Sequence, residues 1–172
     1  MKGNFILDEK GKTDFGNALE LLDKSVHELR QVAHNMMPEA LIKFGLKDAL
    51  TDFCTSLENL KEINIQFRFY GENQRMDQNI EIALYRIAQE LVNYALKHSG
   101  ASEVLIDLVQ DKERINLTIE DNGKGFDIDK ISEFKGMGLK SLKSRVNALN
   151  GVFDIMSIPG KGTEIKVEFG LK

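Results

Sequence analysis

The sequence predicts an α/β (α+β) two-layer sandwich, a mixed sheet with helices on one face, preceded by a long N-terminal helix from a helical bundle. The first observation is a four-and-three spacing of apolar residues over positions 15–37, which is typical of a helix packed along another helix. The second is the mixture of strand-like and helix-like periodicity between positions 46 and 169. The third is a pair of glycine turns, at 121–125 and 136–139.

The N-terminal region divides into a tail or loop at 1–14 and a helix from about 15 to 37. The apolar residues of this helix follow an a/d heptad pattern, and they are Phe15, Leu19, Leu22, Val26, Leu29, Ala33 and Met36. We expect this seam to lie in a bundle, formed with a second copy of the chain. The alternative is an amphipathic helix packed on its own domain.

Pro38 is expected to end that helix, because proline disfavours the α conformation of the preceding residue. Residues 38–45 are then a joint whose last turn is Gly45. The predicted organisation is a tail (1–14), a partial dimerisation helix with its linker (15–45) and a main domain (46–172).

Within the main domain, apolar periodicity predicts three helices and five strands. The helices are expected at 46–60, 76–99 and 139–149, and the strands at 63–70, 104–109, 115–120, 152–157 and 163–169. The strands at 104–109 and 115–120 are expected to pair antiparallel across a short turn. The charged segment 124–135 is predicted to be a mobile lid, with a disordered linker as the alternative.

Composition excludes several classes of function. A net charge of −4 and a pI near 5.5 give no general attraction to nucleic acid. The single cysteine, Cys54, lies in a helical apolar pattern and is expected to be a reduced core residue, as in cytoplasmic proteins. No apolar run approaches the ~20 residues that cross a bilayer, so we expect no membrane contact by this segment and no signal peptide.

The glycine turns carry the strongest functional signal. Asp121 ends a predicted strand, Gly123 and Gly125 follow it, and the stretch G-M-G-L at 136–139 opens a helix. Glycine allows a close approach of backbone N–H groups, and a helix N-terminus attracts phosphate. This order predicts a nucleotide site, with Asp121 at one end and phosphates near 136–139.

The chain resembles bacterial two-component sensor histidine kinases, whose ATP-binding catalytic domain has the Bergerat-type ATPase fold. The matching stretches are Y-R-I-A-Q-E-L-V-N-Y-A-L-K-H-S-G-A-S (85–102), D-N-G-K-G-F-D (121–127), G-M-G-L-K-S-L-K-S-R-V-N-A-L-N-G (136–151) and G-K-G-T-E-I (160–165). Residues 27–46 resemble the last helix of the dimerisation domain. The resemblance implies that 46–172 is the ATP-binding catalytic domain and that ATP or ADP is its ligand.

The resemblance also implies a role for each matching residue. Asp121 would hold the adenine amino group, Gly123 and Gly125 would shape its pocket, and Thr163 would lie near the base. Phosphates would lie near Gly136, Gly138 and Leu139. Glu90 would orient or activate the reacting group, Lys97 would steady phosphate, and His98 would lie near the phosphate end.

One position departs from the resembled pattern. The family carries a metal-binding Asn where this chain has Tyr94, while Asn93 is one residue early and is therefore rotated by about 100° on a helix. A phenol is a poor ligand for Mg²⁺, which prefers carboxylate and amide oxygens. The pattern therefore keeps the nucleotide pocket and puts the Mg²⁺ site in doubt, with Glu90 and Asn93 as the remaining candidate ligands.

The resemblance further implies a homodimer through the helical bundle, a response regulator as partner, and a cytoplasmic location, as an independent protein or as the cytoplasmic part of a membrane-anchored receptor. In the resembled family the preceding bundle helix carries the phosphate-accepting histidine, and its segment has no match here, so the γ-phosphoryl acceptor is expected to be a histidine outside this chain segment. His27 and His34 lie beside the apolar seam and are interpreted as surface residues.

Alternative interpretations remain open. A nucleotide-sensing pseudokinase with weak or no turnover would agree with Tyr94. A serine-directed anti-sigma kinase and a Bergerat ATPase of another type agree less well with the heptad helix and the H-N-M-M-P stretch after it. Simple structural roles also remain: Glu90 and Lys97 as a solvated ion pair, His98 as a cation at a helix end, and Tyr94 packed over the pocket.

Overall fold

The computed structural model describes residue 15 and the ranges 39–57, 63–128 and 138–171. The chain divides into two compact units, 1–38 and 39–172, and the second is the subject here. Almost all of the predicted bundle helix and most of the predicted lid lie outside the described residues. No helix within the described ranges is long and apolar enough to cross a bilayer.

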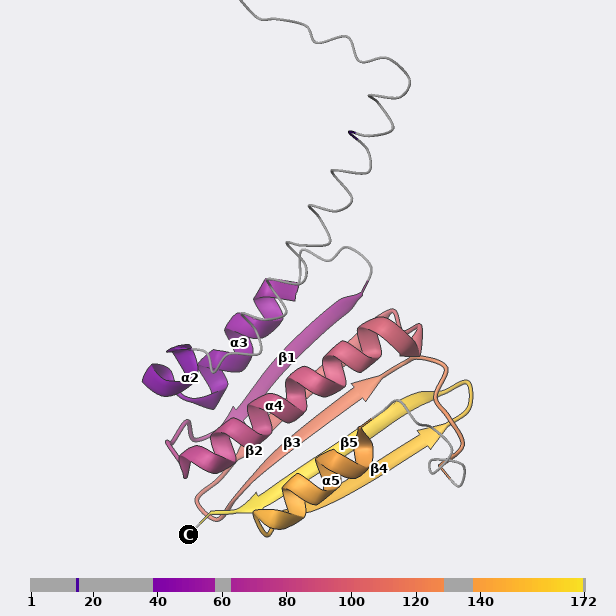
Figure 1. Cartoon of the computed structure of the whole chain (residues 1–172). Helices are drawn as coiled ribbons and strands as arrows, with labels where there is room; N and C mark the ends of the chain where they lie inside the picture. Colours follow the sequence, from indigo (N-terminus) through magenta and orange to yellow (C-terminus); the bar gives the residue numbers. More distant parts are fainter. Residues whose placement is uncertain (1–14, 16–38, 58–62, 129–137, 172) are drawn as a thin grey trace, which may run out of the picture. The chain divides into compact units, whose positions relative to one another are not determined.

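A five-stranded mixed sheet forms one layer, and its strand order is β1-β2-β3-β5-β4 (Figure 1). The strands are β1 (Asn64–Gly71), β2 (Glu103–Gln110), β3 (Arg114–Asp121), β4 (Val152–Ile158) and β5 (Gly162–Gly170). β1 and β2 pair in parallel, and every other neighbouring pair is antiparallel. The predicted antiparallel pairing of 104–109 with 115–120 is confirmed by the β2–β3 register.

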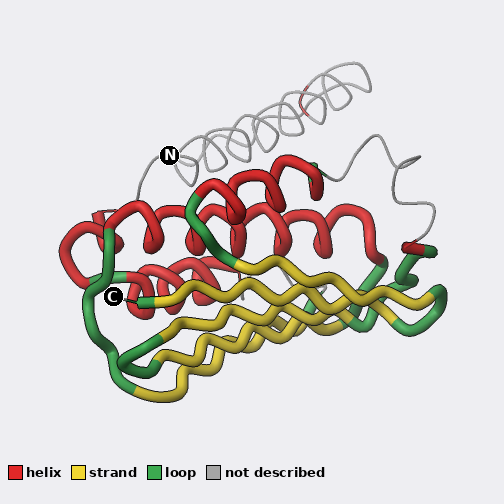
Figure 2. Tube along the Cα trace, turned by 90° about the horizontal axis from the view of Figure 1, so that it is seen from below, coloured by secondary structure: helices red, strands yellow, loops and turns green. Residues whose placement is uncertain are grey.

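Helices cover one face of this sheet, as the side view in Figure 2 shows. They are α2 (Glu39–Phe44), α3 (Leu46–Leu57), α4 (Gln78–Tyr94), a π-helical turn η1 (Ala95–Ser99) and α5 (Leu139–Ala148). The predicted two-layer sandwich is therefore confirmed for the main domain.

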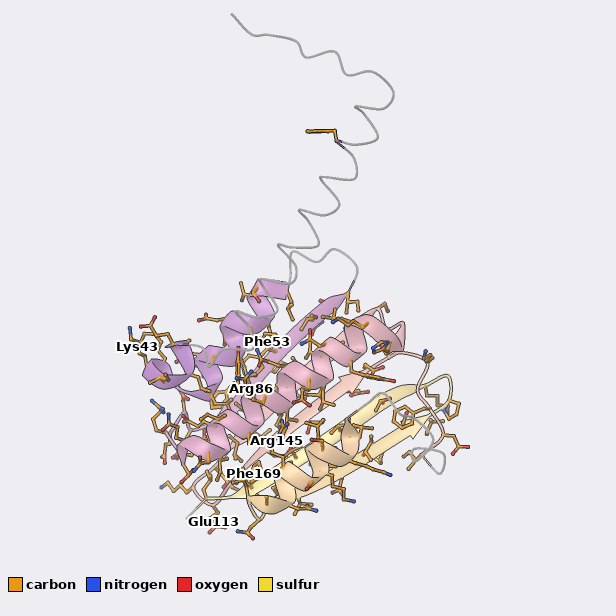
Figure 3. All side chains as sticks on the ribbon, viewed as in Figure 1. Lys43, Phe53, Arg86, Glu113, Arg145 and Phe169 are labelled. Carbon is orange, nitrogen blue, oxygen red and sulfur yellow. The ribbon has the colours of Figure 1, made fainter. Side chains whose placement is uncertain are left out.

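The core lies between these two layers. The buried face of α4 and η1 is the predicted apolar one, and it consists of Leu84, Ile87, Ala88, Leu91, Val92 and Ala95. Strand alternation supplies the other side, for example Val104, Ile106 and Leu108 on β2. Phe53 and Phe169, which Figure 3 labels, belong to the same buried set. Cys54 is also buried, as predicted.

The sheet face away from the helices is solvent-exposed and mixed: it carries charged and polar residues on β1, β2, β3 and β5, and exposed apolar side chains such as Val152, Met156 and Ile158 on β4. On this face Arg68 of β1 forms a bidentate ion pair with Asp107 of β2, with both N–O distances at 2.7 Å. These two residues are direct partners in the parallel register. The alternation of buried and exposed residues along the strands therefore has a simple cause, a sheet covered on one side only.

The predicted helix at 76–99 is corrected at both ends. α4 begins at Gln78 because the Asp77 carboxylate accepts the N–H of Asn79 at 2.7 Å, as an N-cap. The α-helical part ends at Tyr94 and continues as the wider turn η1. Gly100 then stops the helix in a left-handed conformation with φ of 66°. A π-helical turn shifts the angular positions of the residues after it, and such turns are frequent at functional sites.

The predicted joint at 38–45 is also more regular than expected, because α2 forms within it. Arg75 holds this helix to the domain. Its guanidinium donates to the carbonyls of Ile42 and Leu41, at 3.0 and 3.4 Å, and to both carboxylate oxygens of Glu81 at 2.9 Å. Glu81 is only 1% exposed, so its charge depends on Arg75 for compensation.

Candidate nucleotide-binding site

The candidate site begins where β3 ends. Asp121 is the last residue of β3, and the antiparallel register places it directly opposite Thr163 of β5. Both residues are nearly buried, with 7% and 9% of their surfaces exposed. Two residues that lie 42 positions apart in the sequence thus meet where β3 ends and β5 begins, inside the sheet.

Asp121 has an unusual environment for a carboxylate. Burial raises the pKa of Asp121 above its ordinary value, and the backbone hydrogen bond from Gly123 opposes this shift. That bond joins the Gly123 N–H to Oδ1 at 2.9 Å. No described residue donates to Oδ2, so this oxygen remains available to a ligand. A desolvated acceptor of this kind discriminates strongly between ligands that donate a hydrogen and ligands that do not.

Gly123 and Gly125 shape the turn after Asp121 by close backbone packing. A Cβ on Gly123 would lie 2.6 Å from the Ser99 carbonyl oxygen, and one on Gly125 would lie 2.2 Å from the Ile158 carbonyl oxygen. Gly125 also has a φ of 54°, which side chains disfavour. The N–H of Lys124 donates to the Ser99 carbonyl at 2.9 Å. The turn is therefore fixed between the end of η1 and the β4–β5 hairpin.

Ser157 is a site residue that the sequence reasoning missed. It is buried, and its Oγ accepts the N–H of Phe126 at 2.9 Å and donates to the Gly162 carbonyl at 3.1 Å. The Thr163 hydroxyl lies 2.9 Å from the same oxygen. Ser157 thus connects the turn after Asp121 to Thr163. The sequence pattern that could have identified it is a polar residue at an inward-facing position of the strand, on the same face as Phe153.

Tyr94 lies beside the Asp121–Thr163 pair. With Asp121 and Thr163 it lines a cavity of about 20 Å³, whose remaining walls are Leu91, Ile119, Leu139 and Ile165. Burial raises the pKa of the Tyr94 phenol, and the negative charge of Asp121 adds to this shift. Four predicted site residues therefore lie together: Tyr94, Asp121, Leu139 and Thr163.

Leu139 also marks the start of α5. Gly138 precedes it with φ of 60°, and the Gly138 carbonyl accepts the N–H of Leu142 at 2.9 Å as the first bond of the helix. Gly136, the other predicted glycine of this turn, lies outside the described residues. The N-terminus of α5, with its unpaired N–H groups, thus adjoins the cavity through Leu139.

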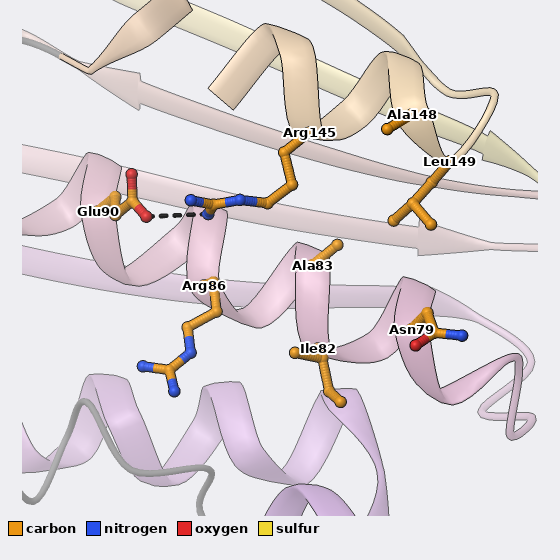
Figure 4. Close-up of a pocket in the computed structure, with 8 residues that line it drawn as sticks. All are labelled: Asn79, Ile82, Ala83, Arg86, Glu90, Arg145, Ala148 and Leu149. Atoms are coloured by element: carbon orange, nitrogen blue, oxygen red, sulfur yellow. Dashed lines mark hydrogen bonds and ion pairs between the residues drawn. The ribbon is translucent and has the colours of Figure 1, made fainter. Parts of the chain in front are cut away.

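Glu90 lies in a different place. It forms an ion pair with Arg145 of α5 at 2.9 Å and contributes to an open groove of about 550 Å³ between α4 and α5 (Figure 4). The groove is lined by Asn79, Ile82, Ala83, Arg86, Glu90, Arg145, Ala148 and Leu149. Figure 4 shows Arg86 pointing away from Arg145. The partner of Glu90 is therefore Arg145 and not Lys97.

The other predicted residues surround the end of α4. Asn93 is partly buried, while Lys97 and His98 are exposed on η1. The His98 ring lies against Tyr94, with ring centroids 5.3 Å apart. The donor set does not fit Mg²⁺ well, since position 94 offers a phenol, which is a poor ligand for this cation.

Comparison with known proteins agrees with this geometry. Residues 79–172 match the model of the family described as histidine kinase-, DNA gyrase B-, and HSP90-like ATPase. Among curated proteins, the histidine-protein kinase/phosphatase DegS of Brevibacillus brevis is 33% identical over 146 residues, covering 85% of this chain and 38% of DegS. DegS of Bacillus subtilis is 38% identical over 139 residues, covering 78% of this chain and 36% of DegS.

The sensor histidine kinase ComP of Bacillus subtilis is 33% identical over 153 residues, which are 88% of this chain and 20% of ComP. The chain thus spans less than half the length of these three relatives. Among solved structures, the histidine kinase domain of the blue-light activated kinase EL346 from Erythrobacter litoralis has a TM-score of 0.59 at 16% identity, covering 73% of this chain and 61% of that one. AdeS of Acinetobacter baumannii has a TM-score of 0.58 at 18% identity, covering 99% and 88%.

Proposed function

Since this chain belongs to the family of histidine kinase-, DNA gyrase B- and HSP90-like ATPases, we propose that it provides the ATP-binding catalytic region of a two-component sensor histidine kinase. The kinase would transfer the γ-phosphoryl group of ATP to a histidine of a helical bundle, and a response regulator would receive it. The observation that carries the proposal is the position of Asp121, a nearly buried carboxylate opposite Thr163 and beside the start of α5.

The adenine end of the nucleotide is assigned to Asp121. Its Oδ2 would accept a hydrogen bond from the exocyclic amino group, while Oδ1 keeps the bond to the Gly123 N–H. The Thr163 hydroxyl lies 2.9 Å from Ser157 Oγ, and its oxygen would accept a hydrogen bond from a water that in turn donates to a ring nitrogen of the base. Guanine carries a carbonyl oxygen in place of that amino group, and it would face the Asp121 carboxylate with a repulsive contact.

The phosphates are assigned to the N-terminal end of α5. Gly138 opens this ten-residue helix and has open space where a side chain would be, so backbone N–H groups remain accessible to an anion. Lys97 and His98 are exposed on η1, and the His98 ring contacts Tyr94, which lines the cavity; both side chains would add positive charge.

The proposed role of Glu90 is to orient or activate the attacking histidine. In the described structure its carboxylate is held by the Arg145 guanidinium at 2.9 Å. Both side chains are partly exposed, 44% for Glu90 and 39% for Arg145, so the pair is weak enough to exchange partners when an acceptor arrives.

A second candidate function is a nucleotide-binding pseudokinase module. Tyr94, at the position where the resembled family has its metal-binding Asn, favours this function specifically. Such a module would bind ADP or ATP and signal through its dimerisation helix with little or no turnover. Turnover assays separate the two functions, whereas nucleotide binding is common to both.

Titration with ADP and ATP, with and without Mg²⁺, tests the proposed function: calorimetry gives the affinity, and unfolding with and without nucleotide gives the stability. Binding of ADP should raise the free energy of unfolding by about 2.7 kcal/mol at a concentration of 100 times the Kd. Asp121→Asn should weaken ADP binding about tenfold or more, because it removes a charge-assisted hydrogen bond. GDP serves as the matched control ligand. Equal affinity for ADP and GDP, or unchanged affinity in Asp121→Asn, would contradict the proposal.

A further inference from the structure

We propose that Tyr94 occupies the adenine cavity and must leave it before a nucleotide binds. This inference rests on the proposed function of the Asp121 site. Tyr94 would then set the apparent nucleotide affinity of the protein by steric competition, separately from its failure to provide a metal ligand.

The size of the cavity is the first support. Its volume of about 20 Å³ has room for about one water molecule, whereas sites for drug-sized ligands have roughly 300–1,000 Å³. A purine ring therefore cannot enter beside the present lining. Some side chain has to move.

The chemistry of the lining identifies that side chain. Five of the seven lining residues are aliphatic residues or threonine. Asp121 is the expected hydrogen-bond acceptor. Tyr94 is the only aromatic residue among these seven. Leu91, Ile119, Leu139 and Asp121 are each at most 7% exposed. Tyr94 is more exposed than these four, so its ring has solvent to move into. A planar six-membered ring also resembles part of a purine in thickness.

The location of Tyr94 in its helix is the second support. It is the last residue of α4, and the wide turn η1 begins at the next residue. The His98 ring, 5.3 Å away, forms its outer neighbour and is exposed. No described residue forms a hydrogen bond with the Tyr94 hydroxyl. A rotamer change at this position therefore breaks a ring contact and no hydrogen bond within the described part of the chain.

Competition of this kind has a defined effect on affinity. When the competent state is only fractionally populated, the apparent Kd rises by the inverse of that fraction. A cavity open in roughly one molecule in ten or fewer weakens the apparent affinity tenfold or more. The effect does not require a metal, because it concerns the base and not the phosphates.

Titration with ADP in the presence of a chelator, without Mg²⁺, isolates this effect. Tyr94→Ala removes the ring and adds no metal ligand, so it should bind ADP at least about tenfold more tightly than the wild type. Tyr94→Phe keeps the ring and should match the wild type within about threefold, because the hydroxyl has no described partner. Thermal unfolding without nucleotide checks that both variants are folded.

A spectroscopic measurement follows the ring itself. The chain has three tyrosines, so protein labelled with 3-fluorotyrosine gives three ¹⁹F resonances, and Tyr94→Phe assigns one of them. Addition of ADP should move the Tyr94 resonance toward that of an exposed tyrosine. Tyr70, which is 51% exposed, and Tyr85, which is 3% exposed, are internal references for the two limits and should not shift.

The outcomes separate this inference from the proposed function. Tighter ADP binding by Tyr94→Ala, with a shifted Tyr94 resonance in the wild type, supports the inference. Equal affinity of wild type and Tyr94→Ala overturns it and leaves the nucleotide site intact. Weaker binding by Tyr94→Ala also overturns it, since the ring would then stack on the base. Absence of ADP binding in every form, Tyr94→Ala included, overturns the proposed function as well.

Discussion

At the scale of single residues, the Asp121 carboxylate shows a conflict between ligand binding and stability. The side chain is nearly buried, and it receives one described hydrogen bond, from the N–H of Gly123. Desolvation raises the pKa of Asp121, so the nucleotide-free fold is less stable with the charged form than it would be with a neutral group. A ligand that donates a hydrogen bond to this carboxylate relieves that cost.

The raised pKa gives a prediction with a definite sign. The folded protein holds the Asp121 proton more tightly than the unfolded chain, so this residue's contribution to stability is complete at pH below the unfolded pKa and is lost as pH rises through the folded pKa. Asp121→Asn does not titrate. It should therefore have a higher Tm than the wild type at pH 7 without nucleotide, and the difference should shrink toward pH 4. A lower Tm at pH 7 would contradict the assigned cause of the shift.

Two glycines of the same region provide a matched comparison. Gly125→Ala would place a Cβ 2.2 Å from the Ile158 carbonyl oxygen at a φ of 54°, and it should cost about 2–5 kcal/mol of unfolding free energy. Gly160 has a φ of 78° with no atom within 4 Å of the added Cβ, so Gly160→Ala should cost only about 1–2 kcal/mol. Denaturant unfolding measures both.

Similar losses for these two variants would show that backbone conformation alone requires glycine at 125. The larger loss at 125 is expected because the turn after Asp121 is fixed against the β4–β5 hairpin, where the Gly160 N–H donates to the Lys124 carbonyl at 2.7 Å.

At the scale of secondary-structure elements, Arg75 determines how firmly α2 is attached to the rest of the domain. Its guanidinium is shared between the carbonyl end of α2 and the buried Glu81 of α4. α2 directly follows residues 1–38 in the sequence.

Removing the two partners of this ion pair should have unequal effects. Arg75→Ala leaves the Glu81 charge buried, with the Met76 N–H at 3.3 Å as its remaining described partner, and should cost about 3–5 kcal/mol. Glu81→Gln keeps one acceptor oxygen for Arg75, which is half exposed, and removes the buried charge, so it should cost less, about 1–2 kcal/mol. Chemical denaturation measures both values.

Arg68→Ala is the control for this pair. Arg68 also forms a bidentate pair, with Asp107 on the open face of the sheet, but its partner is 24% exposed against 1% for Glu81. A solvated pair contributes little, so this variant should lose much less unfolding free energy than Arg75→Ala. An Arg75→Ala cost as small as that of Arg68→Ala would show that water reaches Glu81.

At the scale of the whole molecule, features with a local cause were predictable. Alternation along the strands and the apolar face of α4 follow from one-sided burial, and they predicted the sandwich and the antiparallel β2–β3 pair. The D-x-G-x-G and G-x-G-L turns predicted that Asp121 and the start of the last helix lie close together, and Asp121 and Leu139 do line one cavity.

Features with a long-range cause were not predictable in this way. The ion pair of Glu90 with Arg145 joins residues 55 positions apart, and no periodicity within one helix indicates it. The position of Ser157 depends on the register of β4 against β5, and the π-helical turn depends on packing around the end of α4. The assignments of individual ligand contacts remain predictions, because nucleotide contacts depend on distances that sequence spacing does not contain.

The closed cavity beneath Tyr94 has a kinetic consequence. If the ring has to leave before adenine arrives, association is a two-step process in which opening precedes encounter. The observed rate in a stopped-flow experiment should then level off as the ADP concentration rises, at the rate of ring departure. The rate for Tyr94→Ala should keep rising in proportion to concentration, and a proportional rise in the wild type would show that opening is not limiting. The rate at which the protein binds nucleotide after a rise in its concentration would then be limited by the movement of one aromatic side chain and not by diffusion.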